Sequence, residues 1–303
     1  MMLATKTRRT LTSLAVASTV LGLAACGSDD PVGPDENTIA ETTVATPTLS
    51  TLGTALEAAG LTSTLDGAGP FTVFAPVNDA FADLPNDVVT RLLESGNREI
   101  LEKLLTFHVV PGRVNADDLT DGQTLTTVEG TQLTVSTTDG VRINGALVTT
   151  PDVEASNGVV HLIDGVLLGS LDIVDQATIR GFSSLVSAVG TANLADALRG
   201  GGTTGLTVFA PTNEAFAAIP GGAPTDAETL AQVLQLHAVG ATALSTSLTN
   251  GQTVASLLGP NLTIGVSGTG ITVTGPTNGA TVVTADIVAK NGVIHVIDTV
   301  LLP

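Results

Sequence analysis

The sequence predicts an α+β protein made of two tandem domains. Residues 71–85, FTVFAPVNDAFADLP, match residues 206–220, LTVFAPTNEAFAAIP, at ten of fifteen positions, and residues 144–168 match residues 278–302 at sixteen of 25. The offsets, 135 and 134, are nearly equal, so each repeat is a domain rather than a short solenoid unit. In each repeat helical patterns precede a run of short strands, which indicates helices on one side of a β-sandwich or barrel.

The first residues have the order of a secretory leader. The basic segment TKTRR is followed by a short apolar run from Leu11 that ends in LAAC at residues 23–26. LAAC resembles the lipobox of bacterial lipoproteins, which predicts a signal peptide at residues 1–25 and lipid modification of Cys26. An ordinary signal peptide with an incidental cysteine is the alternative. Cys26 is the only cysteine, which excludes intramolecular disulfides and cysteine metal clusters.

The segment after the leader is acidic. After Cys26 the chain reads GSDDPVGPDEN at residues 27–37, and its Gly, Pro and Asp content predicts a flexible tether at residues 26–36. The whole chain has a formal charge of −18, and removing residues 1–25 removes three basic residues and no acid, which leaves −21. Nucleic acid is therefore excluded as a partner, because phosphate backbones require clustered Lys and Arg.

Each repeat opens with a helix and continues with a buried strand. Leu52 and Leu56 fall on one helical face and match Leu185 and Val189 in the second repeat. The strand reads FTVFAP or LTVFAP, and its final Pro ends it because Pro cannot donate to a sheet ladder.

A short helix follows that strand in each repeat. Asn78 and Asn213 stand directly before DAFADL and EAFAAI. Because an Asn side chain can accept from the free N–H groups of a first helical turn, we expect each Asn to cap the helix that follows it.

A longer amphipathic helix comes next, in NREILEKLLTFH of the first repeat and TDAETLAQVLQLH of the second. The offset between the repeats falls from 135 to 129 across this region. The second repeat has therefore lost about one and a half turns of the segment DVVTRLLESGN. The remainder of each repeat alternates with period two, and Asn-Gly pairs at 144 and 157 predict tight hairpin turns between antiparallel strands.

The two repeated motifs resemble the signatures of the fasciclin family, in the correct order in each repeat, and TFHVVPG stands where that family has its central His. The resemblance implies two wedge-shaped β-sandwiches with a layer of helices, at residues 37–168 and 170–303. It also implies adhesion or matrix contact outside the cell, with no catalytic activity and no cofactor. Animal members use a Tyr-His pair for receptor adhesion, but this chain has no Tyr. The candidate partner contacts at those places are Phe107, His108, Leu236 and His237.

His161 and His295 each precede an Asp by three residues, a spacing to be considered as a metal site. His161 with Asp164, and His295 with Asp298, could supply an imidazole and a carboxylate. Residues three apart on a strand point to opposite faces, so the His and Asp of each pair cannot bind one metal ion. We therefore predict structural, hydrogen-bonded roles for these two His and two Asp residues, and no metal. GVSGT lacks the final Gly of a serine-hydrolase elbow, and GGGTTG follows a helix instead of a strand, so neither predicts a catalytic or phosphate site.

Two functions remain open. The first is an adhesion or interaction module in the cell envelope, lipid-anchored through Cys26 with its domains outside the cytoplasm, that binds an extracellular protein or matrix partner. Two weak sites on one chain would raise its apparent affinity, and we expect the first repeat to bind more strongly because it keeps DVVTRLLESGN and Phe107. The alternative is a binding protein for a small apolar ligand in a pocket beside the helices. The absence of Trp and Tyr argues against a saccharide.

Overall fold

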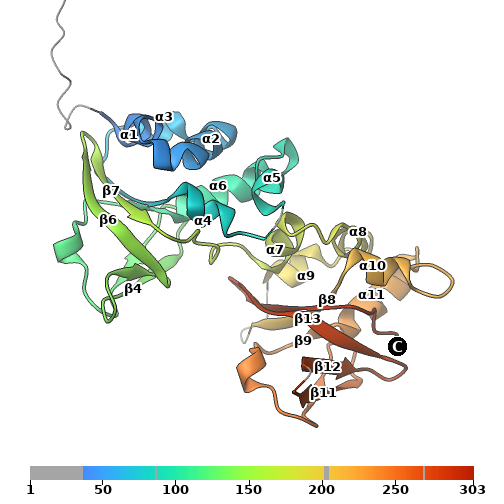
Figure 1. The fold of residues 1–303 in the computed structure, drawn as a ribbon. Helices are drawn as coiled ribbons and strands as arrows, with labels where there is room; N and C mark the ends of the chain where they lie inside the picture. The colour runs from blue at the N-terminus through green and yellow to red at the C-terminus, as the bar shows by residue number, and fades with distance from the viewer. Residues whose placement is uncertain (1–36, 86, 201–204, 269) are drawn as a thin grey trace, which may run out of the picture. The chain divides into compact units, whose positions relative to one another are not determined.

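The computed structural model describes residues 37–85, 87–200, 205–268 and 270–303. The predicted signal peptide, Cys26 and the tether lie outside the described residues. Each repeat combines helices with a seven-stranded sheet, and the blue-to-green first repeat precedes the yellow-to-red second repeat (Figure 1). The predicted α+β class and the two tandem domains are confirmed.

The first repeat contains six α-helices and seven strands among its described residues. Its helices are α1 (Ile39–Ala45), α2 (Ser50–Ala59), α3 (Thr62–Leu65), α4 (Asn78–Ala82), α5 (Val88–Leu92) and α6 (Arg98–Phe107). Its strands are β1 (Phe71–Pro76), β2 (Val109–Pro111), β3 (Thr124–Thr126), β4 (Gln132–Ser136), β5 (Arg142–Ile143), β6 (Ala146–Ala155) and β7 (Gly158–Ile163). Short 3₁₀ turns lie at η1 (Pro47–Leu49), η2 (Ser95–Asn97) and η3 (Ala116–Asp118).

The second repeat has the same order with fewer helices. Its helices are α7 (Ile173–Ile179), α8 (Ser183–Thr191), α9 (Ala195–Gly200), α10 (Asn213–Ala217) and α11 (Ala227–Leu236). Its strands are β8 (Leu206–Pro211), β9 (Ala238–Val239), β10 (Thr253–Ala255), β11 (Asn261–Ser267), β12 (Gly270–Thr274), β13 (Gly279–Ala289) and β14 (Gly292–Ile297), with a 3₁₀ turn at η4 (Ser245–Ser247). None of the residues between α10 and α11, all of which are described, forms a helix corresponding to α5, so the predicted loss is confirmed.

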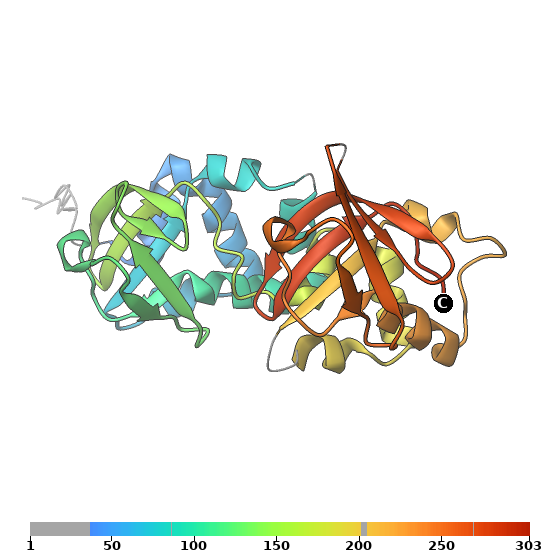
Figure 2. The same ribbon diagram turned by 90° about the horizontal axis from the view of Figure 1, so that it is seen from below.

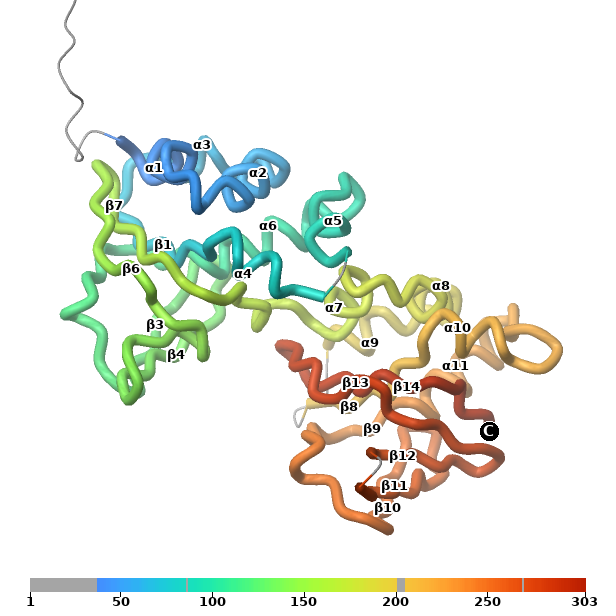
Figure 3. The backbone as a smooth tube through the Cα atoms, viewed as in Figure 1, coloured from blue at the N-terminus to red at the C-terminus, as the bar shows by residue number. Residues whose placement is uncertain are grey.

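One parallel pair of strands lies near one end of each sheet. The strand order is β2-β1-β7-β6-β5-β4-β3 in the first repeat and β10-β11-β12-β13-β14-β8-β9 in the second. β1 pairs in parallel with β7, and β8 with β14, whereas the other pairs of these strands are antiparallel. The labels of Figure 3 locate β1 and β7 in the first repeat and β8 and β14 in the second. The two repeated sequence motifs therefore lie side by side, because each motif contains one strand of the parallel pair.

The parallel pair is buried on both faces because it separates two cores. Along β1, Val73 and Ala75 belong to a core shared with the helices, whereas Phe74 belongs to a second core shared with strands β2 to β5. This alternation follows the period of two of a strand. The second repeat divides in the same way, with Val208 facing the helices and Phe209 facing the strands. Its orange and red strands lie nearest the viewer in Figure 2.

Each sheet curls until its two ends meet. The N–H of Val128, just after β3, donates to the carbonyl of Val109 in β2 over 2.8 Å. In the second repeat the N–H of Leu257 donates to the carbonyl of Ala238 over 2.7 Å. Register shifts in β6 and β13 mark the irregular pairing that accompanies the bend. The expected sandwich is thus a single curled sheet that encloses the second core.

Candidate interaction site

The central His of each repeat is a buried hydrogen-bonded link. His108 Nδ1 lies 2.8 Å from the carbonyl oxygen of Leu104, one turn earlier in α6, and its Nε2 lies 3.0 Å from the N–H of Leu167. Because a backbone N–H can only donate, Nε2 accepts and Nδ1 carries the proton. The neutral ring therefore ties the end of α6 to the segment that follows β7.

The second repeat reproduces this link. His237 Nδ1 lies 2.7 Å from the carbonyl of Val233, and Nε2 accepts from the N–H of Leu301 over 2.9 Å. Burial lowers the pKa of His108 and of His237 to about 4, although the hydrogen bond to the helix carbonyl acts in the opposite direction. Both rings are therefore neutral at physiological pH.

The expectation that the central pairs contact a partner is corrected by their burial. Phe107, His108, Leu236 and His237 are each at most 2% exposed. Phe107 and Leu236 belong to the strand-side cores, and the ring of Phe107 lies nearly perpendicular to that of His108 in a T-shaped arrangement. A helix end is not necessarily a surface position: here the chain after β7 or β14 covers it. These residues position the backbone and offer no surface to a partner in this fold.

His161 and His295 have the structural role that the sequence predicted. Both are fully buried, and each ring bonds to backbone at both nitrogens. His161 Nδ1 accepts from the N–H of Asp152 at the irregular part of β6, and Nε2 lies 2.9 Å from the carbonyl of Val114. His295 makes the matching contacts with Asp286 and Ala243.

The Asp of each His-x-x-Asp motif bonds elsewhere. Asp164 Oδ1 accepts from the N–H of Leu147 over 2.7 Å, and Asp298 Oδ1 accepts from that of Thr281 over 2.8 Å. Each carboxylate holds the strand opposite its own, so the motif does not bring His and Asp together as metal ligands. No group of three or more His, Cys, Asp or Glu that could hold a metal ion is found among the described residues.

The predicted capping role of Asn78 and Asn213 is wrong. Each Asn is already inside its helix, and the N-cap residues are Val77 and Thr212. Asn78 Oδ1 instead accepts from the N–H of Thr51 in the first turn of α2, over 3.0 Å. Asn213 likewise accepts from the N–H of Ser184 in α8. The Asn therefore caps a helix that is distant in the sequence.

Asn157 and Asn291 are a second pair of structural links, which the sequence did not predict. Asn157 Oδ1 accepts from the N–H of Ile39 at the start of α1, and its amide donates to the carbonyls of Leu65 and Gly67. Asn291 does the same for Ile173 at the start of α7. The Asn-Gly pair predicted a hairpin turn, and the turn is present; only the repetition of the Asn pointed to this further role.

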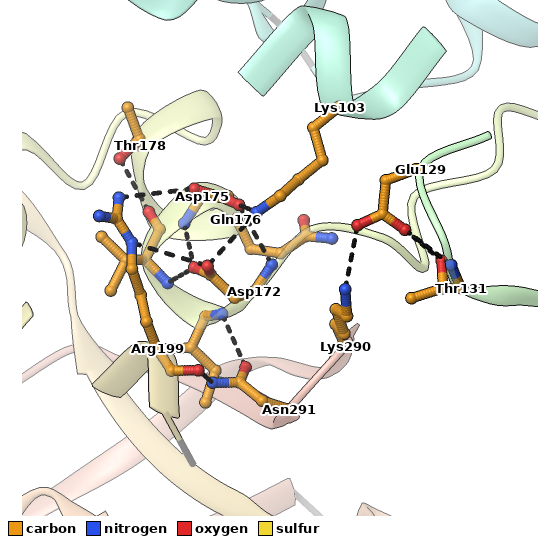
Figure 4. A network of polar contacts seen from close by, with 12 residues as sticks. Lys103, Glu129, Thr131, Asp172, Asp175, Gln176, Thr178, Arg199, Lys290 and Asn291 are labelled. Carbon is orange, nitrogen blue, oxygen red and sulfur yellow. Dashed lines mark hydrogen bonds and ion pairs between the residues drawn. The ribbon is translucent and has the colours of Figure 1, made fainter. Parts of the chain in front are cut away.

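A network of ion pairs joins the repeats (Figure 4). Lys103 in α6 places Nζ 2.6 Å from Asp175 Oδ2 and 3.6 Å from Asp172 Oδ2, both at the start of α7. Burial lowers the pKa of Lys103, but hydrogen bonds and the charges of the two carboxylates outweigh it and raise that pKa. Arg199 in α9 lies 3.6 Å from Asp172 and 3.7 Å from Asp175. The two acids are thus held between cations from both repeats.

A second ion pair lies beside this network. Lys290, in the turn between β13 and β14, places Nζ 3.0 Å from Oε1 of Glu129, whose side chain is 9% exposed. Burial raises the pKa of Glu129, but hydrogen bonds from Thr131 and Lys290 lower it further, so the net pKa is below its ordinary value. A cleft of about 630 Å³ is lined by Lys103, Arg199 and Lys290. Because each of these cations faces a carboxylate, the cleft has no uncompensated charge for recognising an anion.

The enclosed apolar cavity beside the helices of the second repeat is very small. A cavity of about 20 Å³ lies beside the helices of the second repeat, lined by apolar side chains and His237. That volume holds about one water molecule, whereas small-molecule sites are roughly 300–1,000 Å³. This cavity is therefore too small for an apolar ligand, whereas a more open pocket of about 540 Å³ lies beside α8 and α10, with Ala188, Phe216 and Leu230 among its lining residues.

Exposed apolar side chains lie elsewhere on the surface, and two of them occupy matching places. Val128 is 45% exposed and Leu257 is 52% exposed, each at the point where the ends of its sheet meet. The remaining large exposed apolar residues of the described part are Val44, Leu244, Val283 and Val288. Within this part, no helix is long and apolar enough to cross a membrane.

Comparison with known proteins identifies the repeated domain. The family model of the Fasciclin domain matches residues 47–169 and 180–303. Protein sll1483 of Synechocystis is 48% identical over 132 residues, which cover 43% of this chain and 73% of that protein.

Two further relatives extend this result. The transforming growth factor-beta-induced protein ig-h3 of Sus scrofa is 34% identical over 79% of this chain, but the match covers only 35% of that longer protein. The cell surface glycolipoprotein MPB83 of Mycobacterium bovis is 35% identical over 48% of this chain and 70% of its own length. With two family matches that span most of its length, the chain belongs to the fasciclin domain family.

Proposed function

We propose that this protein is an interaction module of the cell envelope, anchored by a lipid on Cys26, that uses its two fasciclin domains to bind an extracellular protein or matrix partner. Membership of the fasciclin family is the observation that carries the proposal. A relative that shares the domain is named a cell surface glycolipoprotein, which agrees with the LAAC motif at residues 23–26.

The surface that meets the partner lies outside the repeated motifs in this proposal. The aromatic and His residues that the motifs repeat are buried, so their repetition reflects folding; they are Phe74, Phe81 and His161 with their counterparts Phe209, Phe216 and His295. Val128 and Leu257 are exposed apolar residues at matching places, and each is held by a backbone hydrogen bond to the neighbouring strand. Single exposed apolar residues are common on proteins, and it is the repetition of this one in both domains that supports a contact role.

Anchoring and orientation are tested together by fractionating cells that produce the full chain. The wild-type protein should sediment with membranes. Protease added to intact cells should digest it, provided that the outer layer of the cells is permeable to the protease. Cys26→Ser should leave the membrane fraction. Equal membrane retention of the two proteins, or protection from protease until the cells are lysed, would contradict the proposal.

The contact residues are tested with purified protein on beads and an extracellular matrix or envelope preparation. Val128→Ser with Leu257→Ser should reduce the material captured, while Val44→Ser, which changes a still more exposed apolar residue at an unmatched place, should not. Equal loss from both variants would show that these two residues have no special role.

A further inference from the structure

We propose that the two domains form one fixed unit, joined through an interface that only this order of repeats can make. The fixed junction keeps the surfaces around Val128 and Leu257 at a constant separation. It goes beyond the proposed function, because it concerns how the two domains are coupled, whatever they bind.

The first support is that helix α7 contributes to both domains. Leu171, just before α7, and Ile179, at its end, are fully buried in the helix-side core of the first repeat, together with Leu92 and Leu101. Ile173 and Ala177 of the same helix belong to the core of the second repeat. A helix that is buried in two cores cannot rotate freely relative to either one.

Helix α5 supplies the second support. It packs against α7, and the guanidinium of Arg91 lies so close to Gly181 that a Cβ at position 181 would come within 2.6 Å of its Cζ. Gly181 also has a φ of +77°, a backbone conformation that favours glycine.

The presence of α5 in one repeat alone then has a physical explanation. In the first repeat α5 has helix α7 of the second repeat to pack against. The expectation that the first repeat binds a partner more strongly was based on Phe107 and the segment DVVTRLLESGN. Phe107 is buried, and α5 of that segment packs on the second domain, so neither feature supports it.

The third support is that the ion pairs are not repeated. The residue that matches Lys103 is Gln232, and the one that matches Glu129 is Leu258. On the opposite side of the junction, Asp172, Asp175 and Lys290 correspond to Thr38, Glu41 and Ser156. Gln232 and Leu258 carry no charge that could pair with a residue such as Glu41. The residues that correspond to the junction in the other repeat therefore cannot form its ion pairs.

This asymmetry has a consequence for assembly. If the counterparts of the junction residues could form the same ion pairs, one copy of the chain could bind the next head to tail, and open filaments would result. Among the described residues, the complete set of these ion pairs, Lys103 with Asp172 and Asp175 and Lys290 with Glu129, occurs once, where the repeats meet. The interface therefore closes within a single chain.

The test measures the distance between the domains in the full chain by electron paramagnetic resonance. Cys26→Ser removes the native thiol, and Glu57→Cys in α2 and Ser187→Cys in α8 introduce two exposed labelling sites, one in each domain. The proposal predicts a single narrow distance distribution. Adding Arg91→Ala, Lys103→Ala and Lys290→Ala should broaden it.

A matched control keeps this outcome interpretable. Arg113 pairs with Glu154 inside the first repeat, so Arg113→Ala removes an ion pair without touching the junction and should leave the distribution narrow. Circular dichroism checks that all variants keep their secondary structure. A broad distribution in the parent protein would overturn the proposal, as would a triple variant that retains its secondary structure and is as narrow as the Arg113→Ala control.

Discussion

Nε2 of His108 accepts a hydrogen bond from the backbone N–H of Leu167, 59 residues later in the chain, over 3.0 Å. Only a ring without a proton on Nε2 can accept this bond. The ring is buried, and burial lowers its pKa to about 4. The same relationship joins His237 to Leu301 in the second domain. The central His therefore couples the fold of each domain to pH.

Stability should fall as the pH is lowered from about 6.5 towards 4. An unfolded His has a pKa near 6.5, so in this range the unfolded chain binds more protons than the folded one, and the free energy of unfolding decreases as pH falls. With a folded pKa of about 4, His108 and His237 should each account for about 2 kcal/mol of loss by pH 5. Thermal or urea unfolding followed by circular dichroism at pH 7, 6 and 5 measures this.

The contribution of the central His residues can be separated from that of other groups. His108→Gln with His237→Gln should lower stability at pH 7 and flatten its dependence on pH between 7 and 5. Some dependence should remain, because burial also lowers the pKa of His161. A double variant with the same pH dependence as the wild type would show that the two rings do not cause it.

Asn213→Ala should weaken α8 rather than α10. The change removes the acceptor for the N–H of Ser184 and should cost about 0.5–2 kcal/mol, the usual effect of losing a helix cap. Hydrogen exchange should speed up at the Ser184 amide and stay unchanged at that of Ala215. Thr212→Ala is the matched control with the opposite pattern, because the Thr212 hydroxyl accepts from Ala215. Faster exchange at Ala215 alone in the Asn213 variant would restore the local-cap interpretation.

Gly158→Ala should be strongly destabilising, by about 3 kcal/mol or more. A Cβ at position 158 would lie 2.0 Å from the carbonyl oxygen of Phe71 on the neighbouring parallel strand, and backbone cannot move aside without breaking the pair. Gly292 has the same contact with Leu206. Gly53→Ala is the control: this glycine lies in α2 with nothing within 4 Å of the added Cβ. It should be neutral or stabilising by up to about 1 kcal/mol. Chemical unfolding midpoints that shift equally for the two variants would contradict the account.

Periodicity and repetition made much of the fold predictable. Helical spacing located α2, α6 and α11, the FTVFAP and LTVFAP segments located β1 and β8, and the change of offset located the missing helix. The partners of side chains were harder to predict. An Asn before a helix gives the same local signal whether it bonds to that helix or to one 27 residues earlier, as Asn78 does to Thr51.

The site could be predicted only where the repeats agree. His161 and His295 were placed correctly because strand alternation separates each from its Asp. The burial of His108 depends on Leu167, which is 59 residues later in the chain, and no local pattern at either residue indicates that the two meet. The pairing of Lys103 with Asp175 occurs only once, so comparison of the repeats carried no signal for it.

We propose above that this fasciclin protein acts at the cell surface by binding a partner there. The most direct measurement is the retention of cells on a surface coated with an extracellular matrix or envelope preparation. Cells that display the wild-type chain should be retained more strongly than cells without it, and Cys26→Ser should reduce retention to the level of the latter while the protein is still produced. Equal retention of all three kinds of cell would contradict the claim.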